Sequence, residues 1–123
     1  MIVKTIEDVM GTKGEAHDNK WHSLRLLHEE DGMGVTLTDS ILEAGFKMQY
    51  WKKRYLEACY CLEGEGIVEE LDTGAVHKIT PGTLYAMNNH DRHLIRARTR
   101  MRVVCTSYPA LKGKEKNDED DSL

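Results

Sequence analysis

The stretch PGTLYAMNNHDRH, residues 81–93, carries the layout that decides how this sequence folds. A Pro-Gly pair forms a turn that starts a short strand, and an Asn-Asn pair forms the turn that ends it. His93 follows the glycine by eleven residues and begins the next segment, residues 93–107. In that segment the odd positions are mostly apolar, whereas the even positions from 96 to 102 are arginines. This alternation predicts a half-buried strand in which His93 points inward.

Turn signals recur along the rest of the chain at intervals of about ten residues. They lie at Gly11/Gly14, 31–34, Gly45, 64–66, 72–74, 81–82, 88–89 and Pro109. Such a cadence predicts a sandwich or barrel of short antiparallel strands. One short helix is predicted at the N-terminus, because Thr5 can cap it, Asp8 lies three residues on, and Gly11 stops it.

Length and composition limit the class of protein. The chain has 123 residues, 40% of them hydrophobic and 31% charged, which predicts one globular domain rather than a disordered chain. A net charge of −4 argues against a general nucleic-acid binder. No uncharged stretch approaches the about 18 residues of a membrane span. Acidic residues early in the chain and an odd number of cysteines, three, lead us to expect a cytoplasmic protein with reduced thiols.

Three segments allow more than one interpretation. In residues 55–62 both faces carry apolar groups, so alternation does not decide which face is inside. The five arginines from Arg92 to Arg102 form either a solvated strand face or a phosphate-binding stripe. We expect residues 1–111 to form the barrel with its helix, and residues 112–123 to form a charged tail, which is either a solvated end or a lid.

Two parts of the chain resemble the two motifs of the cupin family, whose fold is a small double-stranded β-helical barrel. Glu57 precedes a Gly-x-Gly hairpin at residues 64–66, as in the first motif, and His93 matches the histidine of the second. In cupins the first motif supplies two histidines and a glutamate to a metal inside the barrel. This chain lacks the two histidines and has Glu57 and His93 alone at those positions.

The whole chain resembles the ectoine synthase family more specifically. The resemblance rests on the strings EDGMG (30–34), YLEACYCLEGEG (55–66), PGTLYAMNNHDRH (81–93) and LKGKE (111–115). It implies an all-β, single-domain cupin with a short N-terminal helix. It also implies a hydro-lyase for osmolyte biosynthesis under stress, which closes N-γ-acetyl-L-2,4-diaminobutyrate into ectoine with loss of water. Cupins of this size usually pair, so we expect a homodimer.

The family's metal is iron, and its ligand positions correspond here to Glu57, Tyr85 and His93. One carboxylate, one phenolate and one imidazole leave open coordination positions, which suits a catalytic rather than a structural metal. Fe(2+) is therefore expected, although thiolates at Cys59 and Cys61 could attract Zn(2+) or another divalent metal. Taken singly, each ligand also allows a structural role: an ion pair for Glu57, and core packing for the two rings.

The resemblance also implies roles in catalysis and substrate binding. Tyr85 and Glu115 are the acid/base candidates, because an amine must lose a proton and water must leave. The expected substrate-binding residues are Trp21, Arg25, Ser40, Cys105 and Asn117. Arg25 shares a strand face with Trp21, so it could bind a substrate carboxylate, although it could equally be a surface arginine.

Several positions depart from the family's usual residues. These positions are Ser40, Lys52, Tyr55, Ser107 and Asn117. Lys52 is not a mild change: if it faces inward, it adds a cation near an amine that must lose its proton. Two further functions therefore stay open: a related metal cupin acting on another amino-acid amide, and a ligand-binding cupin without catalysis.

Overall fold

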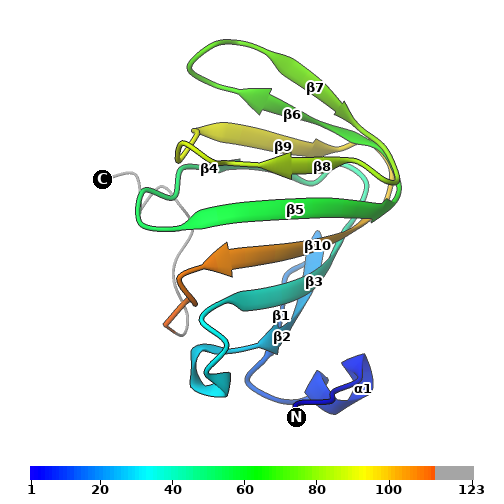
Figure 1. Ribbon diagram of the computed structural model, residues 1–123. Helices are drawn as coiled ribbons and strands as arrows, with labels where there is room; N and C mark the ends of the chain where they lie inside the picture. Colours follow the sequence, from blue (N-terminus) through cyan, green and yellow to red (C-terminus); the bar gives the residue numbers. More distant parts are fainter. Residues whose placement is uncertain (113–123) are drawn as a thin grey trace.

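In this computed structural model, which describes residues 1–112, the strands form two antiparallel sheets that face each other (Figure 1). The larger sheet has the order β1 (Glu15–His17), β2 (Trp21–Leu27), β3 (Thr36–Leu42), β10 (Met101–Tyr108), β5 (Leu56–Glu63) and β8 (Leu84–Ala86). The smaller sheet has the order β4 (Lys47–Tyr50), β9 (His93–Ala97), β6 (Gly66–Glu70) and β7 (Val76–Ile79). The predicted all-β fold is confirmed. Within residues 1–112, no helix is long and apolar enough to cross a membrane.

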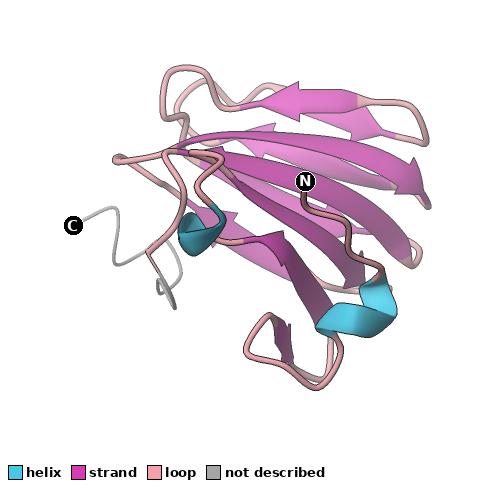
Figure 2. Ribbon diagram, turned by 60° about the horizontal axis from the view of Figure 1, so that its bottom comes forward, coloured by secondary structure: helices cyan, strands magenta, loops and turns pink. Residues whose placement is uncertain are grey.

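A short helix precedes the sheets, as predicted. Helix α1 (Ile6–Val9) lies at the margin of the larger sheet, and a 3-10 helix, η1 (Glu29–Asp31), follows β2 (Figure 2). The Thr5 hydroxyl accepts a hydrogen bond from the Asp8 backbone N–H at 3.2 Å, and the Asp8 carboxylate accepts one from the Thr5 N–H at 2.9 Å. This reciprocal capping satisfies two backbone donors that the helix itself cannot pair.

The hydrophobic core lies between the two sheets. Its buried residues are Phe46, Cys59, Cys61, Val68, Ile79, Met87, Ile95, Ala97, Met101 and Val103. The odd positions from His93 to Val103 that lie in strands are all buried, so the predicted inward direction of this segment is confirmed. In β5 the odd residues Cys59 and Cys61 are buried, whereas Tyr60 is exposed. The structure thereby decides the face that alternation left open.

The arginines of residues 92–102 do not all behave as a solvated face predicts. Arg96, Arg98 and Arg100 are exposed, but Arg102 is half-buried against Asp39. The Arg102 guanidinium donates from Nε to Asp39 Oδ1 at 3.0 Å and from Nη2 to Oδ2 at 2.6 Å. Because Asp39 is a buried carboxylate, this bidentate pair supplies the hydrogen bonds that water would otherwise provide.

We expect the Arg102→Ala substitution to lower the free energy of unfolding by about 2 kcal/mol, because it leaves the buried Asp39 carboxylate unpaired. Urea denaturation followed by circular dichroism measures the change. Arg100→Ala is the control: its Nε lies 3.5 Å from Glu43 at an exposed site, so its loss should cost under about 0.5 kcal/mol. Equal losses in the two variants would contradict the assigned role of Arg102.

Candidate active site

The three predicted metal ligands come from three neighbouring segments and face the barrel interior. Glu57 lies on β5, Tyr85 on β8 and His93 on β9. Strand pairing sets Glu57 opposite Ser107 and Tyr85 opposite Cys59, and both partners lie on inward-facing positions. The rings of Tyr85 and His93 are edge to face, with centroids 6.4 Å apart. The structure therefore brings a carboxylate, a phenol and an imidazole to one side of the interior.

The orientation of His93 leaves one ring nitrogen for a ligand. Its Nδ1 lies 2.9 Å from the Asp91 carbonyl oxygen, and since a carbonyl can only accept, Nδ1 carries the hydrogen. The lone pair is then on Nε2, which is the form of histidine that binds metals. Tyr50 on β4 pairs with His93 on β9. Its ring stacks on the imidazole, with the two ring centroids 5.7 Å apart, and so fixes the plane of the imidazole.

Two side chains hold the carboxylate of Glu57 through the same oxygen. The Ser107 hydroxyl donates to Oε2 at 3.3 Å, and Lys52 Nζ lies 3.5 Å from Oε2. The backbone of Glu57 is fixed as well, because its carbonyl accepts a hydrogen bond from the Met87 N–H at 2.9 Å. The direction of this carboxylate is thus set by Ser107 and Met87, which are far away in the sequence, and by Lys52, which is close in the sequence.

Burial controls the protonation of the groups beside Glu57. Burial raises the pKa of the Tyr85 phenol well above its usual range, and the neighbouring Cys59, Cys105 and Glu57 raise it further. Burial likewise raises the pKa of the Cys59 thiol, whose sulfur lies 2.8 Å from that of Cys105. Without a cation, the phenol and the thiol therefore stay protonated at neutral pH. A divalent cation next to Tyr85 would favour the phenolate and oppose the effect of burial.

This set of donors fits a hard or borderline divalent cation such as iron. Within residues 1–112, no three or more His, Cys, Asp and Glu side chains form a group that could hold a metal ion. Tyr85 would therefore have to complete the set of Glu57 and His93. Carboxylate and phenolate oxygens with one imidazole nitrogen suit iron better than a thiolate-preferring metal.

Strand register places two of the expected substrate-binding residues in one row across the larger sheet. Arg25 pairs with Thr38, Thr38 with Cys105, Cys105 with Cys59, and Cys59 with Tyr85. Residues directly opposite each other share one face of a sheet. Arg25 and Cys105 thus lie on the interior face with the candidate ligands, but four strand spacings of about 4.8 Å separate Arg25 from Tyr85 along the curved sheet.

Trp21 and Ser40 lie on the same face of the larger sheet as Arg25. Trp21 is half-buried and packs against the core. The Ser40 hydroxyl lies 2.7 Å from the Ser23 hydroxyl on the adjacent strand. The other predicted residues, Glu115 and Asn117, lie outside the described residues.

Sequence reasoning missed Tyr50, which stacks on the His93 ring, whereas it noted Lys52 as an altered position of the pocket without assigning it a partner. Tyr50 carries no local signal, because its role depends on the pairing of β4 with β9. Lys52 was noted as an unusual cation, yet its direction depended on the fold. In the structure it points inward to the carboxylate.

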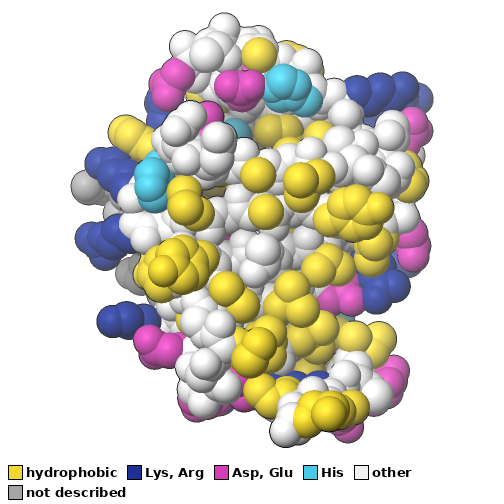
Figure 3. Space-filling view, in the orientation of Figure 1, with side chains coloured by type: hydrophobic (Ala, Val, Ile, Leu, Met, Phe, Trp, Pro, Cys, Tyr) yellow, Lys and Arg dark blue, Asp and Glu magenta, His cyan; other side chains and the backbone are white. Residues whose placement is uncertain are grey.

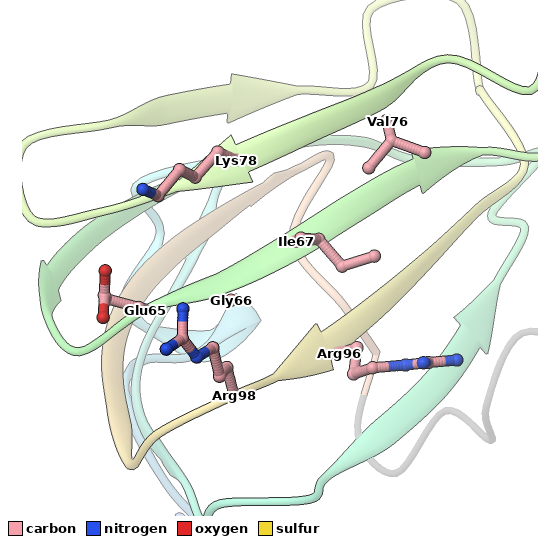
Figure 4. Close-up of a pocket in the computed structure, with 7 residues that line it drawn as sticks. All are labelled: Glu65, Gly66, Ile67, Val76, Lys78, Arg96 and Arg98. Atoms are coloured by element: carbon pink, nitrogen blue, oxygen red, sulfur yellow. The ribbon is translucent and has the colours of Figure 1, made fainter.

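A separate groove lies on the outside of the smaller sheet. It has a volume of about 520 Å³ and includes Ile67 and Val76 with three cations, Lys78, Arg96 and Arg98 (Figure 4). None of the candidate ligands lines it. We place the candidate site at the buried donors instead, because the groove offers neither an imidazole nor a phenol.

Comparison with solved structures defines the class of protein. The RmlC-like cupin from Shewanella frigidimarina superposes with a TM-score of 0.65, covering 78% of this chain and 82% of that chain. Its sequence identity of 18% limits the likeness to the fold. The barrel is therefore a cupin, with a carboxylate, a phenol and an imidazole facing its interior.

Closer relatives define the family. The family model described as ectoine synthase matches residues 1–123. The L-ectoine synthase of Oceanobacillus iheyensis is 47% identical over 120 residues, covering 98% of this chain and 94% of the relative. The crystal structure of ectoine synthase from P. lautus superposes with a TM-score of 0.87 at 44% identity, covering 92% of this chain and 81% of that one. This chain belongs to the ectoine synthase family, which favours that interpretation over the two alternatives.

Proposed function

We propose that this chain is a hydro-lyase that converts N-γ-acetyl-L-2,4-diaminobutyrate into ectoine, with divalent iron held by Glu57, Tyr85 and His93. The observation that carries the proposal is the convergence of these three donors in a chain that is 47% identical to an L-ectoine synthase. Osmolyte production under stress is the corresponding cellular role. Zn(2+) or another divalent metal is the alternative occupant of the same donors.

The reaction joins the α-amine nitrogen to the acetamide carbonyl carbon and releases the carbonyl oxygen as water. It therefore needs one group that takes a proton and one that gives a proton. Burial raises the pKa of Tyr85 whereas a bound cation would lower it, and we assign one of the two proton transfers to its Oη. Glu115 is the second acid/base residue of the proposal. The chemistry that divalent iron supplies when bound is Lewis acidity toward the amide oxygen.

Substrate binding is assigned to the interior face of the larger sheet, which also carries Glu57 and Tyr85. Arg25 is the cation that would bind the substrate carboxylate, and Trp21, Ser40 and Cys105 would line the walls. Asn117 completes the set. A substrate folded so that its two ends meet loses much of the entropic barrier to ring closure.

The direct test loads the purified protein with Fe(2+) under anaerobic conditions and supplies N-γ-acetyl-L-2,4-diaminobutyrate. Ectoine is then measured by chromatography and by proton NMR. We expect ectoine to accumulate with loss of the substrate's acetamide signal. A matched panel of other ω-amides should turn over poorly. Turnover of a panel member without ectoine formation would instead support a different amide as substrate.

We also propose that two copies pair through the outer face of the larger sheet. Apolar side chains gather over this face (Figure 3). They include Leu56, Tyr60, Leu62, Leu84 and Tyr108, which are 38% to 63% exposed. Pairing sets Tyr60 opposite Leu84 and Leu56 opposite Tyr108, so the residues form one patch that ends at strand β8. Exposed patches of this kind commonly mark protein interfaces.

Sedimentation equilibrium should therefore give twice the mass of one chain. Leu84→Glu, which sets a charge in the patch, should shift the protein to single chains at micromolar concentration. Val76→Glu, at an exposed apolar residue on the other sheet, is the control and should leave the mass unchanged. A wild-type protein that sediments as one chain would refute the pairing.

A cytoplasmic location is part of the same proposal. Cys59 and Cys105 are free thiols that lie directly opposite each other on the adjacent strands β5 and β10. The odd number of cysteines, three, supports a reducing compartment, in which these thiols stay reduced.

A further inference from the structure

We propose that Lys52 is a positioning residue of the metal site, which directs Glu57 to offer its Oε1 atom and weakens the binding of divalent cations. The inference rests on the ligand set of the proposed function. It starts from one observation: Lys52 Nζ and Ser107 Oγ both approach the same carboxylate oxygen, Oε2, at 3.5 Å and 3.3 Å. Oε2 is the nearer oxygen to both groups, which leaves Oε1 to face a metal ion.

Lys52 is held in this place by the segment that also carries His93. The backbone carbonyl of Lys52 accepts a hydrogen bond from Nδ1 of His90 at 3.0 Å. Its ammonium lies 5.6 Å from the centre of the Tyr50 ring, which in turn stacks on His93. The side chains of Lys52 and Glu57 are only 20% and 17% exposed, so solvent screens their attraction weakly.

The position of this ammonium has two consequences for a divalent cation. First, the cation must compete with Lys52 for the negative charge of Glu57. Second, once the cation is bound, the two positive charges repel each other at close range. Both effects lower the affinity. Because the long lysine side chain can turn away from the cation, we expect Lys52 to lower the affinity for the cation by about tenfold. A charge fixed in place would lower the affinity much more.

The test measures the dissociation constants of Zn(2+) and Co(2+) at fixed pH, by competition with a chromophoric chelator, and records the Co(2+) absorption spectrum. We expect Lys52→Met to tighten binding about tenfold, which corresponds to about 1.4 kcal/mol, and to change the Co(2+) spectrum. Lys52→Arg keeps the charge and should bind like the wild type. Lys53→Met is the matched control, because this substitution removes the same charge one residue away. The Lys53 ammonium lies 4.5 Å from the centre of the Trp51 ring.

The outcomes separate this inference from the proposed function. If Glu57→Gln weakens metal binding strongly but Lys52→Met leaves it unchanged, the role of Lys52 is refuted and the ligand set stands. If Glu57→Gln itself has no effect, the ligand set fails. If Lys53→Met tightens binding as much as Lys52→Met, the effect is one of net charge and the specific role is refuted. Circular dichroism confirms that each variant is folded.

Discussion

Replacing Glu57 with glutamine is expected to weaken Fe(2+) binding by about 100-fold and to lower ectoine formation by about 1000-fold. The amide keeps the shape of the side chain and can still accept a hydrogen bond from Ser107, so the barrel should fold normally. It removes the negative charge that the proposed ligand set needs. Isothermal titration with Fe(2+) under anaerobic conditions, and the ectoine assay with saturating substrate, measure the two effects.

Glu63→Gln provides the control for this prediction. Glu63 lies at the end of the same strand, but its side chain is 67% exposed. Its Oε2 atom lies 3.9 Å from Nη1 of Arg102. We expect metal binding and activity to stay within about twofold of the wild type, because exposed ion pairs contribute little. A Glu57→Gln variant that keeps full metal affinity would rule out the ligand role.

The largest expected effect on stability is at Gly64, in the hairpin between β5 and β6. Its φ of +85° is costly for any other residue, and an added Cβ would lie 2.7 Å from the Cα of Met101 and even closer to the Arg100 carbonyl oxygen. These atoms belong to the backbone and cannot turn away. Gly64→Ala should therefore lower the free energy of unfolding by about 3 kcal/mol or more. Urea denaturation at constant temperature gives the value.

Gly74→Ala separates the two causes. Gly74 has a φ of +78°, but nothing lies within 4 Å of an added Cβ. Its substitution should cost only the conformational penalty of about 1–2 kcal/mol. If Gly64→Ala costs no more than Gly74→Ala, the close backbone contact at Gly64 does not contribute to stability.

Much of the fold could be predicted because its signals are local. Turn residues at regular intervals predicted short antiparallel strands, and alternation in residues 93–107 predicted that His93 points inward. The capping pair Thr5 and Asp8 predicted the helix that the structure contains. For the site, the resemblance to the ectoine synthase family implied Glu57, Tyr85 and His93, and the structure places these three side chains on inward-facing positions.

The surroundings of the site could not be predicted in the same way. Nothing in residues 55–62 ranks one apolar face above the other, so the direction of Glu57 came only from the resemblance to a family. The stacking of Tyr50 on His93 and the pairing of Cys59 with Cys105 join residues that are distant in the chain. Their signals exist only once the strands are paired.

The amino-acid sequence thus determined the kind of elements, since backbone preferences and alternating polarity act over a few neighbouring residues. The three candidate ligands came from the resemblance of the sequence to a family. Only the tertiary structure decided which face of β5 is inside and what surrounds Glu57. Ser107 and Glu57 are 50 residues apart and meet because β10 pairs with β5 in one particular register. A register shift of one residue would turn every side chain of the strand to the other face, so the environment of the carboxylate is a property of the assembled sheet.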